Sequence, residues 1–429
     1  MPRVVIVGAG FGGLQCAKRL AGKPVDVLVL DRHNYHLFTP LLYQVASSLL
    51  NPSDIAYPVR AVFRKDRNIT FRVAEVTGVD LERRVVHTVE GGDEPYDYLV
   101  LATGARVNFF GQDAVEQRAF WLNDLPGALQ LRNHVLSCFE AAATAAGTVD
   151  ATGPGNAAVS RLLTFVVVGG GPTGVEYAGA LAELVRLIAA NDYPNIGRGD
   201  VRIILVEGTG RILSAFPDSL GADARRRLER LGVTVRLGNL VQSVGDGTVM
   251  LESGEAIATE TLVWAAGVTP NCLSGGLAAP RRPNGRLEVD TCLRLPGRER
   301  VFAIGDVAGC VQGGAELPLL AQPAMQAGRA VAENVLRDLR GHAPEPFRYK
   351  DPGIMATIGR NAGVALIRGI ALKGWLGWVS WLGVHLFFII GFRNRIAVLA
   401  RWAWNYVFYD RPIRFIVREA RRGVPHVRG

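Results

Sequence analysis

The first thirty residues alternate between apolar runs and turn residues in the pattern of an α/β unit. Residues 4–7 form an apolar run, residues 8–13 a glycine-rich turn, and residues 14–20 place apolar side chains at helical spacing. A second, mostly apolar run, 25–30, ends at Asp31. Such runs are typical of strands buried in a parallel sheet, so the pattern predicts a strand, a turn, a helix and a second strand.

The turn at 8–13 carries the first candidate chemistry. Its sequence, Gly-Ala-Gly-Phe-Gly-Gly, fits the G-x-G-x-x-G pattern, in which small residues let the backbone approach a pyrophosphate at a helix N-terminus. Asp31 follows at about the 20-residue distance where a carboxylate accepts hydrogen bonds from an adenosine ribose. The alternative is a glycine turn that binds nothing, and the flanking strands, helix and acid argue against it.

The same arrangement returns 161 residues later. Residues 164–168 predict a strand, 169–174 a Gly-Gly-Gly-Pro-Thr-Gly turn, 175–190 a helix and 201–206 a strand that ends at Glu207. Two complete units predict two bound dinucleotides. Hydride transfer between a nicotinamide and a flavin is the usual reason for one chain to hold both.

Three later apolar runs, 98–105, 262–268 and 301–307, each contain a glycine turn at their end. In the third run Asp306 follows a glycine, where it can accept from a sugar-alcohol hydroxyl such as the ribityl chain of FAD. This layout resembles the two-dinucleotide-binding-domain flavoproteins, in which the N-terminal unit and the late Gly-Asp segment hold FAD and the middle unit holds NAD(P)H. Glu207 should repel a 2′-phosphate, which favours NADH over NADPH, although Arg211 weakens this discrimination.

Length and composition restrict the class of protein. With 429 residues, 49% hydrophobic and 20% charged, the chain can bury more than one core, which excludes disordered, collagen-like and coiled-coil proteins. Its five cysteines show no C-x-x-C or His-rich pairing, which gives no support for a disulfide framework, a metal site or a redox dithiol. We therefore expect an α/β protein with two Rossmann-like domains, a discontinuous FAD-binding domain and an NADH-binding domain inserted in it.

The positive charge of the chain lies in its C-terminal tail. Residues 341–429 hold 14 basic and 4 acidic residues, whereas residues 1–340 hold 34 and 35. The tail also contains five of the seven tryptophans. Tryptophan and arginine beside apolar runs favour an anionic membrane surface, and nucleic acid is the weaker alternative because the charge does not form a polar face.

Two segments of the tail indicate how it meets a membrane. Residues 374–392 are uncharged and could just span a bilayer, but they contain four glycines, Ser380 and His385. The next segment is amphipathic at helical spacing. Its polar face holds Asn394, Arg401 and Asn405, and its apolar face Ile396, Leu399, Ala403, Tyr406 and Val407. The arginines at 411, 414, 418, 421 and 422 extend the pattern. We expect a monotopic anchor of amphipathic helices, and a single span or a solvated basic helix are the alternatives.

The predicted domain boundaries follow from the connecting segments. Asn123-Asp124 before Leu125-Pro126 has the form of a helix N-cap and opens a helix to about residue 146. The composition of residues 147–160 predicts a loop into the NADH-binding unit. We assign 1–155 and 297–347 to the FAD-binding domain, 156–296 to the NADH-binding domain and 348–429 to a C-terminal membrane-anchoring domain.

Five segments resemble those of the type II NADH:quinone oxidoreductases, single-subunit respiratory dehydrogenases that do not pump protons. They are G-A-G-F-G-G-L at 8–14, P-L-L-Y-Q-V-A at 40–46, G-G-G-P-T-G-V-E at 169–176, A-Q-P-A-M-Q at 321–326 and G-F-R-N-R at 391–395. The resemblance covers nearly the whole chain. It implies an enzyme in which NADH gives a hydride to FAD and the reduced flavin gives two electrons to a membrane quinone.

The resemblance also implies three catalytic residues. Gln322 and Gln326 are four positions apart, on one face of a predicted helix, and in this family the glutamines of that motif line the quinone pocket. Glu176 matches the glutamate of the second glycine motif, which is important at the active centre of the family. The alternatives are a solvated or capping glutamine pair, and an acid that stabilises its helix N-terminus.

The cofactor assignments form two groups. FAD is assigned to Gly8, Ala9, Gly10, Phe11, Gly12, Gly13, Asp31, Arg32, Ala74, Thr103, Gly104, Asp306, Ala324 and Met325. NADH is assigned to Gly169, Gly171, Gly174, Glu207 and Gly267. The implied partners are NADH, a membrane quinone (ubiquinone or menaquinone) and the lipid surface, with a homodimer left open. The implied location is the cytoplasmic face of the cell inner membrane, as a peripheral or monotopic protein.

Three other functions remain as alternatives at this point. A sulfide:quinone oxidoreductase shares the fold and the membrane docking but needs reactive cysteines beside the flavin, and no cysteine here has a partner at a suggestive spacing. A soluble ferredoxin or disulfide reductase is opposed by the missing C-x-x-C and by the tail. A non-catalytic, membrane-bound NADH sensor differs from an enzyme in that NADH should not bleach its flavin.

Overall fold

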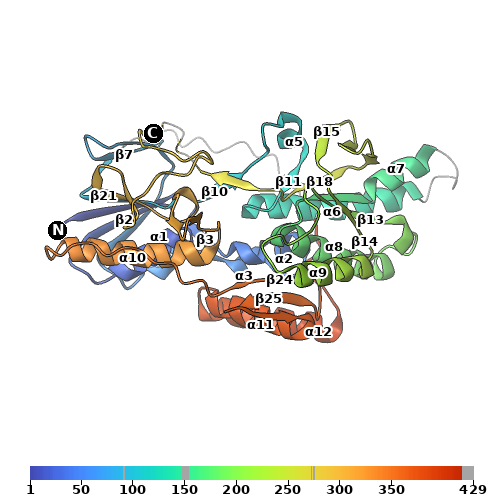
Figure 1. The fold of residues 1–429 in the computed structure, drawn as a ribbon. Coiled ribbons are helices and arrows are strands. Elements are labelled where there is room, and N and C mark those ends of the chain that lie inside the picture. Colours follow the sequence, from blue (N-terminus) through green and yellow to red (C-terminus); the bar gives the residue numbers. More distant parts are fainter. Residues whose placement is uncertain (90–91, 147–153, 272, 274–275, 418–429) are drawn as a thin grey trace, which may run out of the picture.

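A computed structural model describes the whole chain except residues 90–91, 147–153, 272, 274–275 and 418–429. Figure 1 shows two α/β units side by side along the long axis, with a C-terminal layer below them in this view. The long apolar runs of the sequence form the central strands of the two units, because each such strand is covered on both faces.

The first unit contains a six-stranded sheet with strand order β20-β21-β9-β1-β2-β5, in which β20 alone is antiparallel to its neighbour. In chain order the strands are β1 (Arg3–Val7), β2 (Asp26–Asp31), β5 (Ile69–Val73), β9 (Tyr98–Leu101), β20 (Arg294–Leu295) and β21 (Arg298–Ala303). Helices α1 (Phe11–Leu20) and α10 (Ala321–Asp338) pack tightly, since a Cβ on Gly328 would lie 2.2 Å from the Gly12 carbonyl oxygen. This contact brings the late helix to the first glycine turn.

The second unit repeats the core of the first. Its five parallel strands have the order β11-β18-β12-β13-β14, so β18-β12-β13-β14 corresponds to β9-β1-β2-β5. They are β11 (Phe120–Trp121), β12 (Thr164–Val168), β13 (Arg202–Glu207), β14 (Val233–Leu237) and β18 (Thr261–Trp264). Its main helices are α6 (Leu125–Ala146), α8 (Pro172–Asn191) and α9 (Asp218–Arg230). The predicted duplication of the nucleotide-binding unit is therefore confirmed at the level of strand order.

Short strands and helices connect these parts. Three small antiparallel sheets contain β6 (Val76–Asp80), β7 (Val85–Thr88) and β8 (Asp93–Pro95); β15 (Val241–Gly245), β16 (Thr248–Leu251) and β17 (Ala256–Ala258); and β10 (Ala105–Val107) with β19 (Val268–Pro270). The other pairs are β3 (Tyr35–Leu37) with β4 (Ala56–Pro58) and β22 (Val311–Gln312) with β23 (Ala315–Glu316). The short helices are α2 (Leu42–Ala46), α3 (Pro52–Ile55), α4 (Val59–Val62), α5 (Asp113–Arg118) and α7 (Pro154–Leu162), and the 3-10 turns are η1 (Thr39–Leu41), η2 (Arg198–Asp200) and η3 (Gly305–Val307).

The chain crosses between the two sheets at other places than the sequence predicts. Strand β11 already pairs with β18 of the second sheet, well before the predicted boundary at 155, and β20 already belongs to the first sheet before residue 297. Both strands have two residues, too few to show a period in the sequence. The predicted loop at 147–160 is wrong from residue 154, where α7 begins, and its first part lies outside the described residues. The predicted cap of α6 is confirmed, because Asp124 Oδ1 accepts from the Gly127 amide at 2.7 Å.

The C-terminal unit contains a three-stranded antiparallel sheet that was not predicted from the sequence. Its strands are β24 (Ile354–Thr357), β25 (Gly363–Ile367) and β26 (Ile370–Lys373), followed by α11 (Gly374–Phe388) and α12 (Phe392–Phe408). Buried side chains of this unit, including Trp381, Trp402 and Val364, belong to the same hydrophobic core as α6, α8 and the second sheet. Within the described residues, no helix has the length and hydropathy needed to cross a bilayer.

Candidate functional site

The two glycine turns have matching backbone geometry. A Cβ at Gly8, which has φ +106°, would lie 2.2 Å from the Ala102 carbonyl oxygen, and one at Gly169, with φ +111°, would lie 2.3 Å from that of Ala265. The third glycines are equally confined, since a Cβ at Gly13 or Gly174 would lie 1.9 Å from the carbonyl oxygen of the first glycine of its own turn. The middle glycines, Gly10 and Gly171, have nothing within 4 Å of a Cβ position. Each turn thus has a tightly packed base and an open outer side, as a bound pyrophosphate requires.

The acids that end β2 and β13 hold these turns. Asp31 accepts from the Ala9 amide at 2.7 Å and from the His33 amide at 2.8 Å. Glu207 accepts from the Gly170 amide at 2.5 Å and from the Thr209 amide at 2.8 Å. The spacing alone suggested contact with a ribose, and the structure adds a second role, because each carboxylate uses both oxygens to fix the loop that approaches the nucleotide.

The segments assigned to FAD meet at the first turn. A Cβ at Gly12 would lie 3.1 Å from the Ala324 carbonyl oxygen, and one at Gly305 would lie 3.1 Å from the Ala324 Cβ. Asp306 follows on η3, and burial raises its pKa while Arg286 opposes that shift. Among the described residues no hydrogen bond reaches its carboxylate, so it is free to accept from a ligand hydroxyl. This cradle of small residues around an unpaired carboxylate fits FAD.

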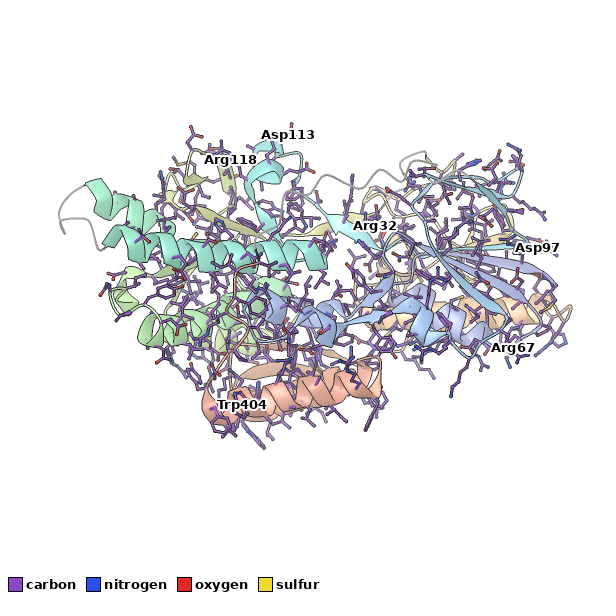
Figure 2. The ribbon with its side chains drawn as sticks, turned by 180° about the vertical axis from the view of Figure 1, so that it is seen from behind. Arg32, Arg67, Asp97, Asp113, Arg118 and Trp404 are labelled. Carbon is purple, nitrogen blue, oxygen red and sulfur yellow. The ribbon has the colours of Figure 1, made fainter. Side chains whose placement is uncertain are left out.

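The other positions assigned to FAD or NADH surround the same strand ends. The Ala74 amide donates to the Asp31 carbonyl at 2.9 Å, and the Thr103 hydroxyl donates to the Asn271 carbonyl at 2.8 Å. The remaining assigned positions are Phe11, whose ring packs edge-on to His36 at 5.0 Å, the buried Met325, the exposed Arg32 (Figure 2), Gly104 with φ +69°, and Gly267 beside Phe110.

The two glutamines of α10 differ in their contacts. Gln326 binds the backbone of Lys350 through both ends of its amide, with Nε2 donating to the carbonyl at 2.9 Å and Oε1 accepting from the amide at 3.0 Å. No hydrogen bond to Gln322 occurs among the described residues, and both side chains are half-buried. The pocket lined by Glu176 includes neither glutamine. The structure therefore separates the three predicted catalytic residues into two places.

Glu176 is buried in the first turns of α8, with 8% of its surface exposed. Its Oε1 accepts from the Thr357 amide at 3.1 Å and from the Trp381 indole Nε1 at 3.0 Å, both of which belong to the C-terminal unit. Burial raises the pKa of Glu176 to about 8, and the two N–H donors oppose that shift. At neutral pH this carboxyl therefore holds a proton that an exposed glutamate would have lost.

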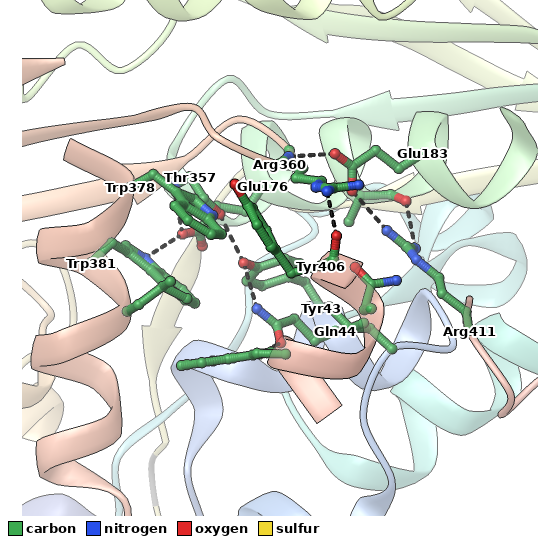
Figure 3. A pocket seen from close by; sticks show the side chains of 16 residues that line it. Tyr43, Gln44, Glu176, Glu183, Thr357, Arg360, Trp378, Trp381, Tyr406 and Arg411 are labelled. Atoms are coloured by element: carbon green, nitrogen blue, oxygen red, sulfur yellow. Dashed lines mark hydrogen bonds and ion pairs between the residues drawn. The ribbon is translucent and has the colours of Figure 1, made fainter. Parts of the chain in front are cut away.

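A pocket opens beside Glu176 (Figure 3). Aromatic side chains from α11 and α12 line one side, among them Trp378, Trp381 and Tyr406. A chain of hydrogen bonds also lines the pocket, in which Trp402 Nε1 donates to Gln44 Oε1 at 2.8 Å, Gln44 Nε2 donates to the Tyr43 hydroxyl at 3.0 Å, and that hydroxyl shares a hydrogen with Thr357 Oγ1 at 2.8 Å. The pocket therefore lies where all three units meet.

A buried ion pair closes the far side of the pocket. Arg411 is 2% exposed, and its guanidinium donates to Glu183 at 2.9 Å, to the Ser47 carbonyl at 2.8 Å and to the Ala180 carbonyl at 2.9 Å. The sequence pattern predicts Arg411 at a membrane interface. This prediction is wrong, because the guanidinium is buried in hydrogen bonds to Glu183 and two backbone carbonyl groups. Arg414 pairs with Asp192 at 2.7 Å, and arginines 418, 421 and 422 lie outside the described residues.

Several residues of this pocket were not singled out from the sequence. Tyr43 and Gln44 stand in the P-L-L-Y-Q-V-A segment, which gave a signal of family resemblance but no role. Thr357 and Glu183 gave no signal, because they reach the pocket only through the packing of the C-terminal unit on α8. Trp381 is one of the five tail tryptophans predicted to lie at a membrane surface, and for this residue the prediction is wrong because its indole is buried against Glu176. Of the cysteines, burial raises the pKa of Cys16 to about 12 and of Cys138 to about 11, so neither is a reactive thiolate.

Comparisons with known proteins agree with this geometry. The model of the pyridine nucleotide-disulphide oxidoreductase family matches residues 2–328. The type II NADH:quinone oxidoreductase Ndh of Mycobacterium tuberculosis is 37% identical over 422 residues, which cover 94% of this chain and 88% of that protein. The mitochondrial internal alternative NAD(P)H-ubiquinone oxidoreductase A1 of Arabidopsis thaliana is 32% identical over 441 residues, which cover 95% of this chain and 84% of that protein.

A solved structure shares the fold over almost the same length. NDH2 from Plasmodium falciparum in complex with NADH superimposes with a TM-score of 0.87 at 22% identity, over 96% of this chain and 99% of the other. The sulfide:quinone oxidoreductase from Aquifex aeolicus gives a TM-score of 0.71 at 17% identity, over 95% of each chain. At these identities both likenesses concern the fold.

Proposed function

The chain belongs to the type II NADH:quinone oxidoreductases, and on this premise we propose that it oxidises NADH and reduces a membrane quinone. The reaction is NADH + H⁺ + quinone → NAD⁺ + quinol. The observation that carries the proposal is the duplicated nucleotide turn, of which only the first copy is closed by Gly305 and Ala324. Bound FAD supplies the redox chemistry, since it accepts a hydride and releases two electrons.

Each glycine turn has a separate task in this proposal. The first turn and the N-terminus of α1 hold the FAD pyrophosphate, and Asp306 accepts from a ribityl hydroxyl. The second turn holds the pyrophosphate of NADH at the N-terminus of α8. Glu207 lies beside this turn, where its charge opposes a 2′-phosphate, and Arg211 is engaged by the Ser214 carbonyl at 2.6 Å and by Asp218. The substrate is therefore NADH.

Glu176 and the glutamines serve the quinone side. Quinol formation consumes protons, and the carboxyl of Glu176 holds one at neutral pH because burial raises its pKa to about 8. Gln322 has a free amide that can donate to a quinone carbonyl. Gln326 fixes the segment at Lys350 and keeps one amide N–H for a quinone bound beside Gln322, outside the pocket lined by Glu176.

The membrane-docking part of the proposal rests on α12, a helix that buries polar side chains and exposes apolar ones. Its polar residues Asn394 and Arg401 face inward, where Asn394 donates to the Ser53 carbonyl at 3.1 Å and Arg401 pairs with Asp54 at 2.7 Å. Many apolar residues of α12 and α11 are nevertheless exposed, and Figure 2 shows Trp404 on the outer side of this layer. The exposed set comprises Trp375, Leu376, Val379, Val384, Phe387, Phe392, Ile396, Leu399, Trp404, Val407 and Phe408.

An apolar surface of this extent suits the interface of a bilayer, with the chain lying on the membrane. We place the protein on the cytoplasmic face of the inner membrane, as a peripheral or monotopic enzyme. Its quinone, ubiquinone or menaquinone, would enter from the lipid side, and a homodimer is compatible with this arrangement.

Steady-state turnover tests the proposed function. The full-length flavoprotein on liposomes that contain quinone should oxidise NADH and leave sulfide unoxidised. Gln322→Ala should lower quinone reduction by about 2- to 13-fold and spare flavin reduction by NADH, because one hydrogen bond to the quinone is lost. Gln130→Ala, an exposed position on α6, is the matched control. Sulfide oxidation, or slower flavin reduction in Gln322→Ala, would contradict the assignment.

A further inference from the structure

Trp381 is the point where the membrane-facing helix α11 enters the interior. Five large apolar side chains of α11 are exposed, whereas Trp381 is 1% exposed. Its indole N–H donates to Glu176, which lies 205 positions earlier in the chain on α8 of the second unit. A tryptophan whose only task was to anchor the helix in lipid would point to the other side of α11.

Two glycines set the position of this indole. A Cβ at Gly377 would lie 2.4 Å from the Gly363 carbonyl oxygen, and one at Gly363 would lie 2.7 Å from the Trp378 amide, so α11 packs directly on β25. Trp381 is one turn after Gly377 and therefore on the same face. Its ring stacks on His385 at 4.0 Å with an interplanar angle of 22°. The His385 Nδ1 in turn pairs with the Trp381 carbonyl at 2.8 Å.

Both hydrogen bonds to Glu176 Oε1 come from the C-terminal unit, one from Trp381 and one from the Thr357 amide. We propose that Trp381 and Thr357 are positioning residues that orient the carboxyl of Glu176 and set its protonation during quinone reduction. The C-terminal unit then completes the catalytic pocket in addition to docking the protein. This inference rests on the proposed function.

Among the described residues, the hydrogen-bond partners of the Glu176 carboxyl are Trp381 and the Thr357 amide, although several charged or titratable side chains lie nearby. The titratable or charged side chains packed nearby are Tyr43 on α2, Glu183 on α8, His385 on α11, Arg360 after β24 and Arg411 after α12. None of the five hydrogen-bonds to Glu176 within the described part of the chain. Burial keeps His385 neutral, with a pKa lowered to about 4, and it raises the pKa of Tyr43 well above its usual value.

The sign of the expected effect follows from the donors. An N–H donor stabilises the carboxylate, so its removal raises the pKa of Glu176 above about 8. If the protonated carboxyl is the active form, the rate of quinone reduction falls as pH rises through that pKa. This fall in rate forms the alkaline limb of the pH profile. Trp381→Phe keeps an aromatic ring but lacks the N–H, so the midpoint of the alkaline limb should rise by about one to two pH units.

Trp264→Phe is the matched control, because Trp264 is also buried and donates its N–H at 2.8 Å, but to the Asn108 carbonyl, and it does not line the pocket. The pH profile of quinone turnover is measured for the full-length protein on liposomes, with NADH oxidation by ferricyanide as a check on fold and flavin content. We expect an upward shift of the limb in Trp381→Phe and none in Trp264→Phe. A uniform loss of rate at every pH in Trp381→Phe, with the limb unmoved, would overturn the inference.

An infrared titration without turnover separates this inference from the proposed function. The protonated carboxyl of Glu176 has a carbonyl band that Glu176→Gln identifies by its loss. Its midpoint should rise in Trp381→Phe by the same amount as the kinetic limb. If the wild-type protein reduces no quinone, the proposed function fails. If it reduces quinone while the infrared midpoint of Trp381→Phe equals that of the wild type, only the positioning role fails.

Discussion

At the scale of single residues, we propose that the carboxylate of Glu207 serves both structure and nucleotide specificity. It accepts from the Gly170 and Thr209 amides and so fixes the second glycine turn. Its charge remains beside the site proposed for the NADH ribose. A substitution of Glu207 that loosens the turn should weaken the binding of NADH and NADPH alike. Any change in the preference between the two nucleotides should therefore come from the lost charge.

We predict that the wild-type protein has a far higher kcat/KM for NADH than for NADPH. Glu207→Gln should narrow this ratio by about 10- to 100-fold, because a charged hydrogen bond to the ribose and the repulsion of a 2′-phosphate are lost together. Steady-state kinetics with both nucleotides measure the ratio, and Glu252→Gln, on the surface of the same unit, controls for net charge. Equal efficiency with NADH and NADPH in the wild type would refute the role of Glu207.

At the scale of secondary structure, α12 combines an inward polar face with an outward apolar face. Leu399 is 52% exposed and Val407 69% exposed, and neither supports the interior. We predict that Leu399→Glu with Val407→Glu abolishes sedimentation with anionic liposomes, because charged side chains cannot enter the lipid interface at low cost. NADH oxidation by ferricyanide should persist. Val89→Glu, at an apolar position 61% exposed on the first unit, should still bind; equal binding by the α12 variant would refute the docking surface.

The segment after α12, residues 409–417, is held to the second unit by Arg411. Removing one partner of a buried ion pair leaves the other charge unpaired, at a cost of about 3–5 kcal/mol. We predict that Arg411→Met strongly lowers the apparent urea midpoint of unfolding. Arg414→Met should lower it little, because the side chain of Arg414 is 23% exposed and its pair with Asp192 contributes about 0–1 kcal/mol. Similar midpoints for the two variants would contradict the buried role of Arg411.

Features that depend on a local sequence pattern, such as buried strands and glycine turns, were mostly predicted from the sequence. Buried parallel strands such as β1 and β12 are continuous apolar runs, and the glycine turns after them have a fixed spacing, so both nucleotide units were visible. Strand β11 was not, because its two residues gain their pairing only from β18. The contacts of Glu176 with Thr357 and Trp381 join residues 181 and 205 positions apart, and no periodicity reports such a contact.

At the scale of the whole molecule, two nucleotide-binding units and a C-terminal layer share one pocket. Tyr43 comes from the first unit, Glu176 from the second and Trp381 from the C-terminal layer. The family accounts for the reaction, and the pocket brings the buried carboxyl of Glu176 into contact with α11 of the C-terminal layer. The central claim is that this chain carries electrons from NADH to a membrane quinone.

Anaerobic stopped-flow absorption of the full-length flavoprotein on liposomes tests this claim most directly. The account predicts that NADH bleaches the flavin, that a membrane quinone added in a second mixing step restores its colour, and that both steps are fast enough to support the steady-state rate. A flavin that NADH does not bleach, or a reduced flavin that quinone leaves reduced, would contradict it.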